Sequence, residues 1–153
     1  MSPVTPPLRP ILLAEDNPND VELTLAALHS VQLANEIVVV HDGAQALDWL
    51  RRQGAYAHRP PAAPAVILLD LKMPRVDGLE TLRAIRADPA LASLPVVILT
   101  SSREESDLVS SYQLGANAYV VKPVEFDSFI SAVSQLGLFW AVLNEPPPTP
   151  KTH

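Results

Sequence analysis

Apolar residues fall into five short runs along the chain, and each run is followed by a stretch with apolar residues at helical spacing. The runs occupy 10–14, 36–40, 65–70, 95–100 and 118–122. The first, third and fourth runs are continuously apolar rather than alternating, which is typical of strands that are buried on both faces. Five alternations of strand and helix predict an α/β domain: a doubly wound, five-stranded parallel sheet with helices on both faces.

The predicted helices begin at residues that favour helix termini. Asn17 can cap the first helix, and Pro18 suits its first turn. Asp42 and Gln45 form the capping-box pattern at the start of the second helix. The five helices are expected over 17–31, 42–54, 77–88, 104–114 and 124–143.

The last predicted helix carries two apolar stripes, although a helix on a sheet needs only one. We expect one stripe to face the sheet: Phe126, Ile130 and Val133. The other has heptad-like spacing and consists of Phe129, Val133, Leu136, Trp140 and Leu143. An exposed stripe with a tryptophan is typical of an interface, so we predict a homodimer through this C-terminal region. The alternative is that the tail folds back on its own domain.

Prolines mark the ends of the compact region. Of the 16 prolines, four lie within the first ten residues and four within 146–150. Because proline fixes φ and removes a backbone donor, both ends are expected to be extended. We therefore predict a tail over 1–9, one domain over 10–136, and a helical extension with a proline-rich tail over 137–153.

Composition excludes several classes of protein. With 17 acidic and 11 basic side chains, the net charge is −6, which disfavours nucleic-acid binding. The chain has no cysteine and therefore no disulfide or thiolate metal site. No apolar run approaches the roughly 20 residues of a membrane span, and the N-terminus does not resemble a secretory signal. We expect a cytoplasmic protein with no membrane association.

Polar side chains follow four of the predicted strands, where each strand ends. They are Glu15, Asp16, Asp70, Thr100 and Lys122. Because parallel strands place their carboxyl ends at one edge of the sheet, these side chains are expected to meet there. Three adjacent carboxylates require a cation or a proton, and all-oxygen ligation suits Mg²⁺. Taken singly, each acidic residue could equally be a helix cap.

Asp70 is the natural reactive group in this set. It ends the third, central strand, and a carboxylate can act as a nucleophile that forms an acyl phosphate. The hydroxyl of Thr100 and the ammonium of Lys122 supply the positioning and charge neutralisation that phosphoryl transfer needs. The sequence therefore predicts phosphoryl transfer to Asp70.

The ordered set of motifs resembles the receiver domain of two-component response regulators over about 11–136. The motifs are Glu15-Asp16-Asn17, Asp70-Leu71-Lys72-Met73-Pro74, Thr100-Ser101 and Lys122-Pro123. Each is weak alone, but their order and spacing together are specific. The resemblance implies the flavodoxin-like (βα)5 fold and a phosphoryl donor in the form of a phosphohistidine on a sensor histidine kinase.

The resemblance also implies a role for each site residue. Asp70 is the phosphoacceptor, and Mg²⁺ is held by Glu15, Asp16, Asp70 and the backbone carbonyl of Lys72. Thr100 hydrogen-bonds the phosphoryl group, and Lys122 pairs with it. Tyr119 and Thr100 form the conformational switch, and a cis peptide bond precedes Pro123. The expected function is signalling by phosphorylation-dependent conformational change and partner binding.

A finer resemblance is to the single-domain regulators that pair with bacterial phytochrome kinases. It rests on the segments 15–20, 139–140 and 144–147 and on the long loop before Val66. It implies a bacteriophytochrome as the kinase partner.

Two other functions remain open at this point. An aspartate-nucleophile phosphatase of the haloacid-dehalogenase type usually has a second carboxylate two residues after the nucleophile, where this chain has Lys72. A receiver that serves as a scaffold without being phosphorylated would not need the five site residues, all of which are present. We therefore expect no enzyme beyond a domain that catalyses its own phosphorylation and dephosphorylation.

Overall fold

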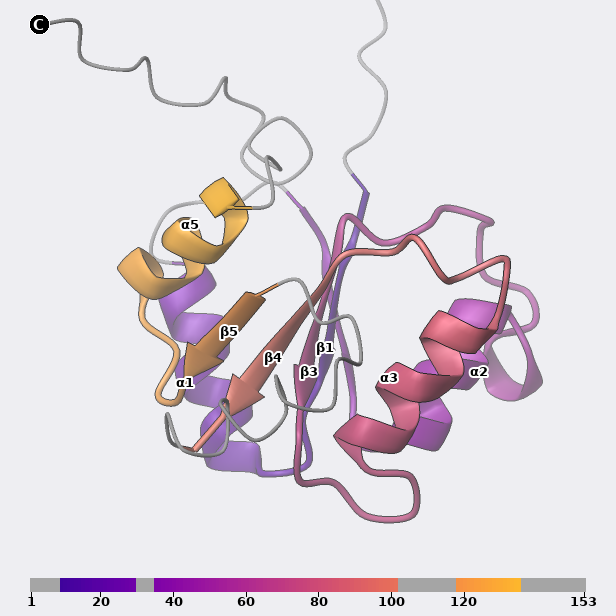
Figure 1. Ribbon diagram of the computed structural model, residues 1–153, viewed down its shortest axis with the longest axis horizontal. Helices are drawn as coiled ribbons and strands as arrows, with labels where there is room; N and C mark the ends of the chain where they lie inside the picture. Colours follow the sequence, from indigo (N-terminus) through magenta and orange to yellow (C-terminus); the bar gives the residue numbers. More distant parts are fainter. Residues whose placement is uncertain (1–8, 30–34, 102–117, 136–153) are drawn as a thin grey trace, which may run out of the picture.

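A computed structural model describes residues 9–29, 35–101 and 118–135 (Figure 1). Its five strands form one parallel sheet in the order β2-β1-β3-β4-β5. The strands are β1 (Ile11–Ala14), β2 (Ile37–Val40), β3 (Val66–Asp70), β4 (Val96–Thr100) and β5 (Ala118–Val121). The predicted fold class is confirmed, with β3 at the centre of the sheet.

Helices cover both faces of the sheet. They are α1 (Pro18–His29), α2 (Gly43–Arg51), α3 (Gly78–Ala87) and α5 (Phe126–Gln135), with a short 3-10 turn, η1 (Gly54–Tyr56). The helices α2 and α3 lie together on one face, and α1 and α5 lie on the other (Figure 1). The predicted helix over 104–114, the tails and the extension beyond 135 lie outside the described residues.

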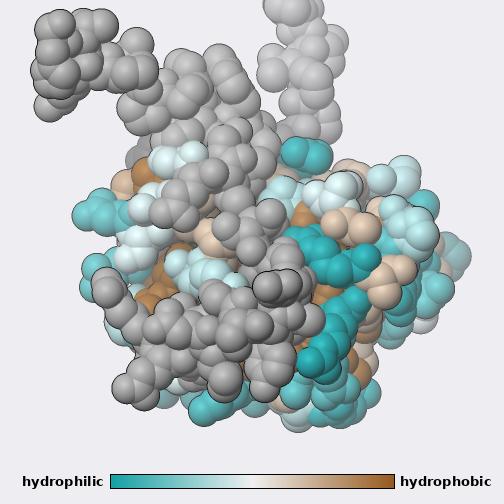
Figure 2. Space-filling model, viewed as in Figure 1, coloured by the Kyte–Doolittle hydropathy of each residue, from teal (hydrophilic) through white to brown (hydrophobic). Residues whose placement is uncertain are grey.

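The core has two parts because successive strand residues point to opposite faces of the sheet. On the α2–α3 side, Leu12 and Ala14 pack with Trp49 and Leu82. On the α1–α5 side, residues such as Leu13 pack with helix residues of that layer. In Figure 2 the outer surface on the α2–α3 side is mostly hydrophilic, as expected for amphipathic helices over a buried sheet.

Helix caps fix where α2 and α3 begin. The Asp42 carboxylate accepts a hydrogen bond from the Gln45 backbone N–H at 2.8 Å, and the Gln45 side chain accepts one from the His41 backbone N–H at 2.8 Å. Asp77 accepts from the Glu80 backbone N–H at 2.9 Å. The predicted cap by Asp42 is therefore present, but the Gln45 side chain accepts from the N–H of His41 rather than from that of Asp42, so the reciprocal half of the predicted capping box differs. The C-terminus of α2 comes earlier than predicted, at Arg51 rather than residue 54.

The prediction for the faces of the last helix was wrong for Phe129. We placed Phe129 on the exposed stripe, but its side chain is only 1% exposed and packs in the core between α5 and the sheet. Phe126 and Ile130, predicted to face the sheet, are half-buried. The small residue Ala132 lies three positions after Phe129 and is also buried, so the face defined by these two residues is the one that α5 buries.

Within the described ranges, no helix combines the length and apolar character that a membrane crossing requires.

Candidate functional site

The strand register brings the carboxyl ends of β1, β3, β4 and β5 to one edge of the sheet (Figure 1). Ala14 pairs with Leu69, so Glu15 and Asp70 follow at neighbouring positions. Thr100 pairs with Val121, which places Lys122 one residue beyond it, and the Lys122 backbone N–H donates to the Thr100 carbonyl at 2.7 Å. Four residues from distant parts of the sequence therefore share this edge.

The Lys122 ammonium is the centre of this site. Its Nζ lies 3.3 Å from Asp70 Oδ2 and 3.4 Å from Glu15 Oε1. A third carboxylate, Asp20 Oδ2, is nearer still at 2.8 Å. The structure thus brings together three of the predicted site residues, Glu15, Asp70 and Lys122, and adds Asp20 to them.

These groups are largely removed from water. Glu15 is fully buried, Asp70 is 4% exposed, and the Lys122 side chain is 17% exposed. Burial, together with the hydrogen bond and charge of Asp70, raises the pKa of Glu15 to about 9. Burial alone would lower the pKa of Lys122, but its hydrogen bond to Asp20 and the charges of Asp70 and Glu15 outweigh it and raise that pKa. Lys122 is therefore a permanent cation here.

The donor set suits a hard divalent cation. Glu15 Oε2 is buried and accepts no hydrogen bond, although a buried carboxylate oxygen normally has a donor or a cation beside it. Carboxylate oxygens are the ligands that Mg²⁺ prefers. Asp16 is exposed, and the described residues include no cluster of three acidic or histidine side chains that could hold a metal. The Lys122 ammonium contacts one oxygen of each of the two buried groups, Glu15 and Asp70.

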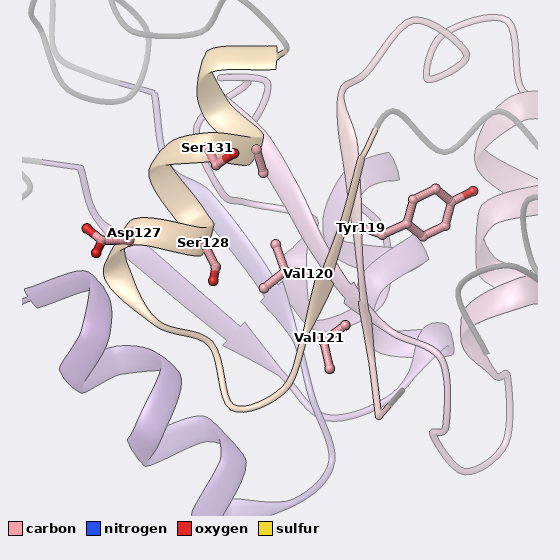
Figure 3. Close-up of a pocket in the computed structure, with 7 residues that line it drawn as sticks. Tyr119, Val120, Val121, Asp127, Ser128 and Ser131 are labelled. Carbon is pink, nitrogen blue, oxygen red and sulfur yellow. The ribbon is translucent and has the colours of Figure 1, made fainter. Parts of the chain in front are cut away.

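The other predicted residues surround this edge. Thr100 is fully buried at the end of β4. The Lys72 side chain is exposed, and its backbone N–H lies 3.5 Å from Asp70 Oδ1. Tyr119 is half-buried, points to the opposite side of β5 from Val120, and packs against the α2–α3 side of the core (Figure 3). The predicted cis peptide bond between Lys122 and Pro123 is present.

The segment after Asp70 is tied to the fold at both ends. The Gly78 backbone N–H donates to the Leu71 carbonyl at 2.9 Å, and a Cβ at Gly78 would collide with the Asp70 carbonyl oxygen. Arg75 adopts a φ of 62° and its Nε donates to Asp42 Oδ2 at 2.9 Å. This segment, 71–77, is called the acceptor segment because it follows Asp70, the predicted phosphoacceptor. It is held by α3 on one side and by the start of α2 on the other.

Sequence reasoning missed the role of Asp20. Its position in the first turn of α1 indicated only a favourable interaction with the helix dipole. The available signal was its short separation in sequence from Asp16, which directly follows β1. A side chain in the first turn of α1 still lies near the edge of the sheet where β1 ends. Its partner, Lys122, lies 102 positions away in the sequence, and no local spacing identifies that partner.

A separate groove of about 530 Å³ lies between β5 and α5 (Figure 3). Its lining includes Val121, Asp127, Ser128 and Ser131. None of the carboxylates around Lys122 lines it. The acidic cluster at the strand ends is thus distinct from this groove.

The chain matches the family described as response regulator receiver domain over residues 11–134. It is 36% identical to the response regulator Rcp1 of Synechocystis sp. over 140 residues, which cover 92% of this chain and 94% of that protein. Among solved structures, it is 62% identical to the bacteriophytochrome response regulator AtBRR, with a TM-score of 0.86, covering 92% of this chain and 100% of that chain.

Two further solved structures are similar over nearly their whole length. The phosphorylated cyanobacterial phytochrome response regulator RcpA is 37% identical with a TM-score of 0.71, covering 93% of this chain and 99% of that chain. The Mn²⁺-bound form of Rcp1 is 34% identical with a TM-score of 0.70, covering 92% of this chain and 99% of that chain. One relative has thus been solved with a phosphoryl group and another with a divalent cation.

Proposed function

The chain belongs to the response regulator receiver family, and from this we propose that it receives a phosphoryl group on Asp70 from the phosphohistidine of a sensor kinase. It is a signalling domain of the two-component type rather than a metabolic enzyme. One observation carries the choice of acceptor: Asp70 ends the central strand with its Oδ2 3.3 Å from the Lys122 ammonium.

In the proposed transfer, an Asp70 carboxylate oxygen attacks phosphorus while the phosphorus–nitrogen bond of the phosphohistidine breaks. The imidazole leaves with the bonding electron pair, and the product is an acyl phosphate. Lys122 stays charged throughout and can pair with the phosphoryl oxygens. Thr100, buried at the end of β4, would hydrogen-bond the same group.

Receiver domains bind a divalent cation, and the oxygen donors of this acidic cluster fit Mg²⁺. The proposed ligands are Glu15, Asp16, Asp70 and the backbone carbonyl of Lys72. When bound, Mg²⁺ offsets the negative charge on the phosphoryl oxygens and on the carboxylates. Glu15 Oε2, which is buried and has no hydrogen-bond partner, supports the assignment of Glu15 as a Mg²⁺ ligand.

The proposed output is a shift between two conformations of the β4–β5 region. Phosphorylation draws Thr100 toward the phosphoryl group, and Tyr119, which is half-buried in this structure, becomes more deeply buried. The hydrogen bond from the Lys122 backbone N–H to the Thr100 carbonyl links the two strand ends involved. The partner that reads this change would contact the surface of β5 and its neighbours.

The proposed kinase partner is a bacteriophytochrome. Support comes from the identity of 62% to a bacteriophytochrome response regulator over 92% of this chain. The test is phosphotransfer from purified kinases: transfer from a bacteriophytochrome kinase should be faster than from kinases of other input classes at equal concentration. Equal or slower transfer would remove this partner while leaving Asp70 as the acceptor.

Labelling with acetyl phosphate and Mg²⁺ tests the acceptor without any kinase. The wild-type protein should gain one base-labile phosphoryl group, and Asp70→Asn should gain none. The matched control is Asp88→Asn, since Asp88 lies at the far end of α3 and pairs with Arg51. Equal labelling of wild type and Asp70→Asn would show that the acceptor is wrong.

A further inference from the structure

Asp20 makes the shortest contact of the Lys122 ammonium, yet it is not among the groups assigned to phosphoryl transfer or metal binding. Its Oδ2 lies 2.8 Å from Nζ, against 3.3 Å for Asp70 and 3.4 Å for Glu15. Of the three carboxylates, Asp20 has the most exposed side chain, 29% against 6% and 0%. The nearest partner of the site lysine is thus also its most solvated one.

We propose that Asp20 is a positioning residue that holds the Lys122 ammonium on the α1 side of the acidic cluster and competes with the phosphoryl group for it. The inference rests on the proposed function, because it concerns how Lys122 engages a phosphoryl group on Asp70. Asp20 touches neither phosphorus nor the acceptor in this scheme; its interactions in the site are with Lys122 and with the side chain of Glu15.

The backbone of α1 fixes Asp20 in this place. Asn17 caps the helix: its Oδ1 accepts hydrogen bonds from the backbone N–H groups of Asn19 at 2.9 Å and Asp20 at 3.2 Å. The first turn of α1 therefore starts at the end of β1, beside Glu15. From there a short aspartate side chain reaches Lys122 without further rearrangement.

The number of donors on Lys122 makes the contacts competitive. An ammonium has three N–H donors, and three carboxylates lie within hydrogen-bond distance of Nζ. A phosphoryl oxygen can gain a donor only if one of these carboxylates gives one up. Separating a buried carboxylate from its cation is costly, whereas an exposed carboxylate is rehydrated by water. Asp20 is therefore the contact that gives way.

Asp20 pairs with the Lys122 ammonium at 2.8 Å through a carboxylate that is 29% exposed, so water can solvate Asp20 when the pair opens. Replacing it with a neutral residue should leave Lys122 freer to turn toward the acceptor.

The experiment measures binding of beryllofluoride, a phosphoryl mimic, in the presence of Mg²⁺ by ¹⁹F NMR or calorimetry. Asp20→Asn should bind the mimic about two- to fivefold more tightly than wild type, as expected for loss of one partly exposed ion-pair competitor. Asp20→Glu, which keeps the charge, should remain near wild type. Glu22→Gln removes an equal charge from an exposed position on α1 and should leave the affinity unchanged.

A double-mutant cycle with Lys122→Ala separates positioning from simple charge repulsion. If Asp20 acts through Lys122, Asp20→Asn should have no effect on beryllofluoride affinity in the Lys122→Ala background. An equal gain in both backgrounds would mean that Asp20 merely repels the anion, and the inference would be overturned. Unchanged or weaker binding by Asp20→Asn in the wild-type background would overturn it as well.

The same titrations distinguish this inference from the proposed function. If the wild-type protein binds beryllofluoride and Asp70→Asn does not, the acceptor assignment stands whatever Asp20 does. If wild type does not bind the mimic, the proposed function fails first. Thermal unfolding of each variant shows that it is folded, and Asp20→Ser replaces Asp20→Asn if the latter is not.

Discussion

Glu15 is a carboxylate whose charge the fold disfavours. It is fully buried, its Oε2 has no hydrogen-bond partner, and only one oxygen contacts Lys122. Such a group lowers stability, and under the proposed function a divalent cation bound to Glu15 would offset that cost. The energetic consequence can be measured in the protein kept free of divalent cations.

Glu15→Gln should change how stability depends on pH. Burial and Asp70 raise the pKa of Glu15 from 4.5 to about 9, so the folded state retains a proton that the unfolded state has lost between these values. Stability therefore falls as pH rises from about 4.5 to 9, and Gln at this position removes that loss. Urea unfolding in EDTA should show wild type falling relative to the variant by more than about 1 kcal/mol over this range.

Glu22→Gln is the control for that measurement because Glu22 is exposed on α1. It should leave the pH dependence of wild type unchanged. Parallel pH profiles for wild type and Glu15→Gln would contradict the account of Glu15.

The positions of two side chains, Asp20 and Phe129, could not be predicted from a single sequence. Lys122 and Asp70 were expected to meet because parallel strands end at one edge of a sheet. Asp20 was not expected there because its contact depends on the direction of α1 and the reach of Lys122. Phe129 was placed on the wrong face of α5 because two apolar stripes overlap in that helix, and only tertiary packing decides which one is buried.

The start of α2 is connected to the segment that follows Asp70. Asp42 caps α2 through the Gln45 backbone N–H and also pairs with Arg75 in the acceptor segment. The Gly43 backbone N–H donates to the Val76 carbonyl at 2.9 Å. These contacts couple the acceptor segment to the start of α2, so loss of the Asp42 cap should also affect the segment that follows Asp70.

Asp42→Ala should lower the free energy of unfolding by about 1–3 kcal/mol, from loss of the cap and of a charged hydrogen bond. Burial alone would raise the pKa of Asp42, but the hydrogen bonds from the Gln45 N–H and Arg75 outweigh it and lower the pKa below its usual 3.8. This contribution is present above about pH 3.8 and is lost as pH falls below that value. Denaturant unfolding at neutral and acid pH checks both statements.

Asp77→Ala is the matched control because Asp77 caps α3 through the Glu80 N–H, as Asp42 caps α2. Asp42 differs from Asp77 in that it also pairs with Arg75. Asp42→Ala should therefore be more destabilising at neutral pH than Asp77→Ala. Equal losses would mean that Arg75 adds nothing to the stability of the acceptor segment.

Arg59 holds the long loop before β3 against α2. Its guanidinium lies 3.7 Å from the centroid of the Trp49 ring, and its Nε donates to the Trp49 carbonyl at 2.6 Å. Another nitrogen donates to the Ala62 carbonyl at 3.0 Å. Arg59→Ala should lower the free energy of unfolding by about 1–2 kcal/mol.

The measurement is urea unfolding followed by the fluorescence of Trp49 in a Trp140→Phe background. Arg59→Ala should also shift that emission toward longer wavelength because the ring becomes more exposed. Arg52→Ala, whose Nε contacts the Arg59 carbonyl from an exposed position, is the control and should have a smaller effect. An unchanged emission would show that Arg59 does not shield Trp49.

The architecture was the most predictable level of this protein. The continuous apolar runs of β1, β3 and β4 allow little besides a buried parallel sheet, and the five strands lie where the pattern placed them. The less predictable contacts are those between helix termini and loops, such as Asp42 with Arg75, because they join residues whose spacing follows no period. The hydrophobic pattern also does not determine the oligomeric state. Phe129 belongs to the core, and the remaining members of its predicted stripe lie outside the described side chains.

Homodimer formation through the C-terminal region therefore stays a prediction. A chain truncated before Gly137 should sediment as a monomer at concentrations where the full chain is a dimer. The control is a chain that lacks only 146–153, which should retain the dimer. Unchanged dimer affinity after the longer truncation would remove the predicted interface.

Chemical trapping of the phosphorylated protein tests the central claim most directly. After reaction with acetyl phosphate and Mg²⁺, sodium borohydride reduces an aspartyl phosphate to homoserine, which peptide mass spectrometry locates. The convergence of Glu15, Asp70 and Lys122 predicts homoserine at position 70, and none in the absence of a divalent cation. Homoserine at another aspartate, or none at position 70 under conditions that label the protein, would contradict the account.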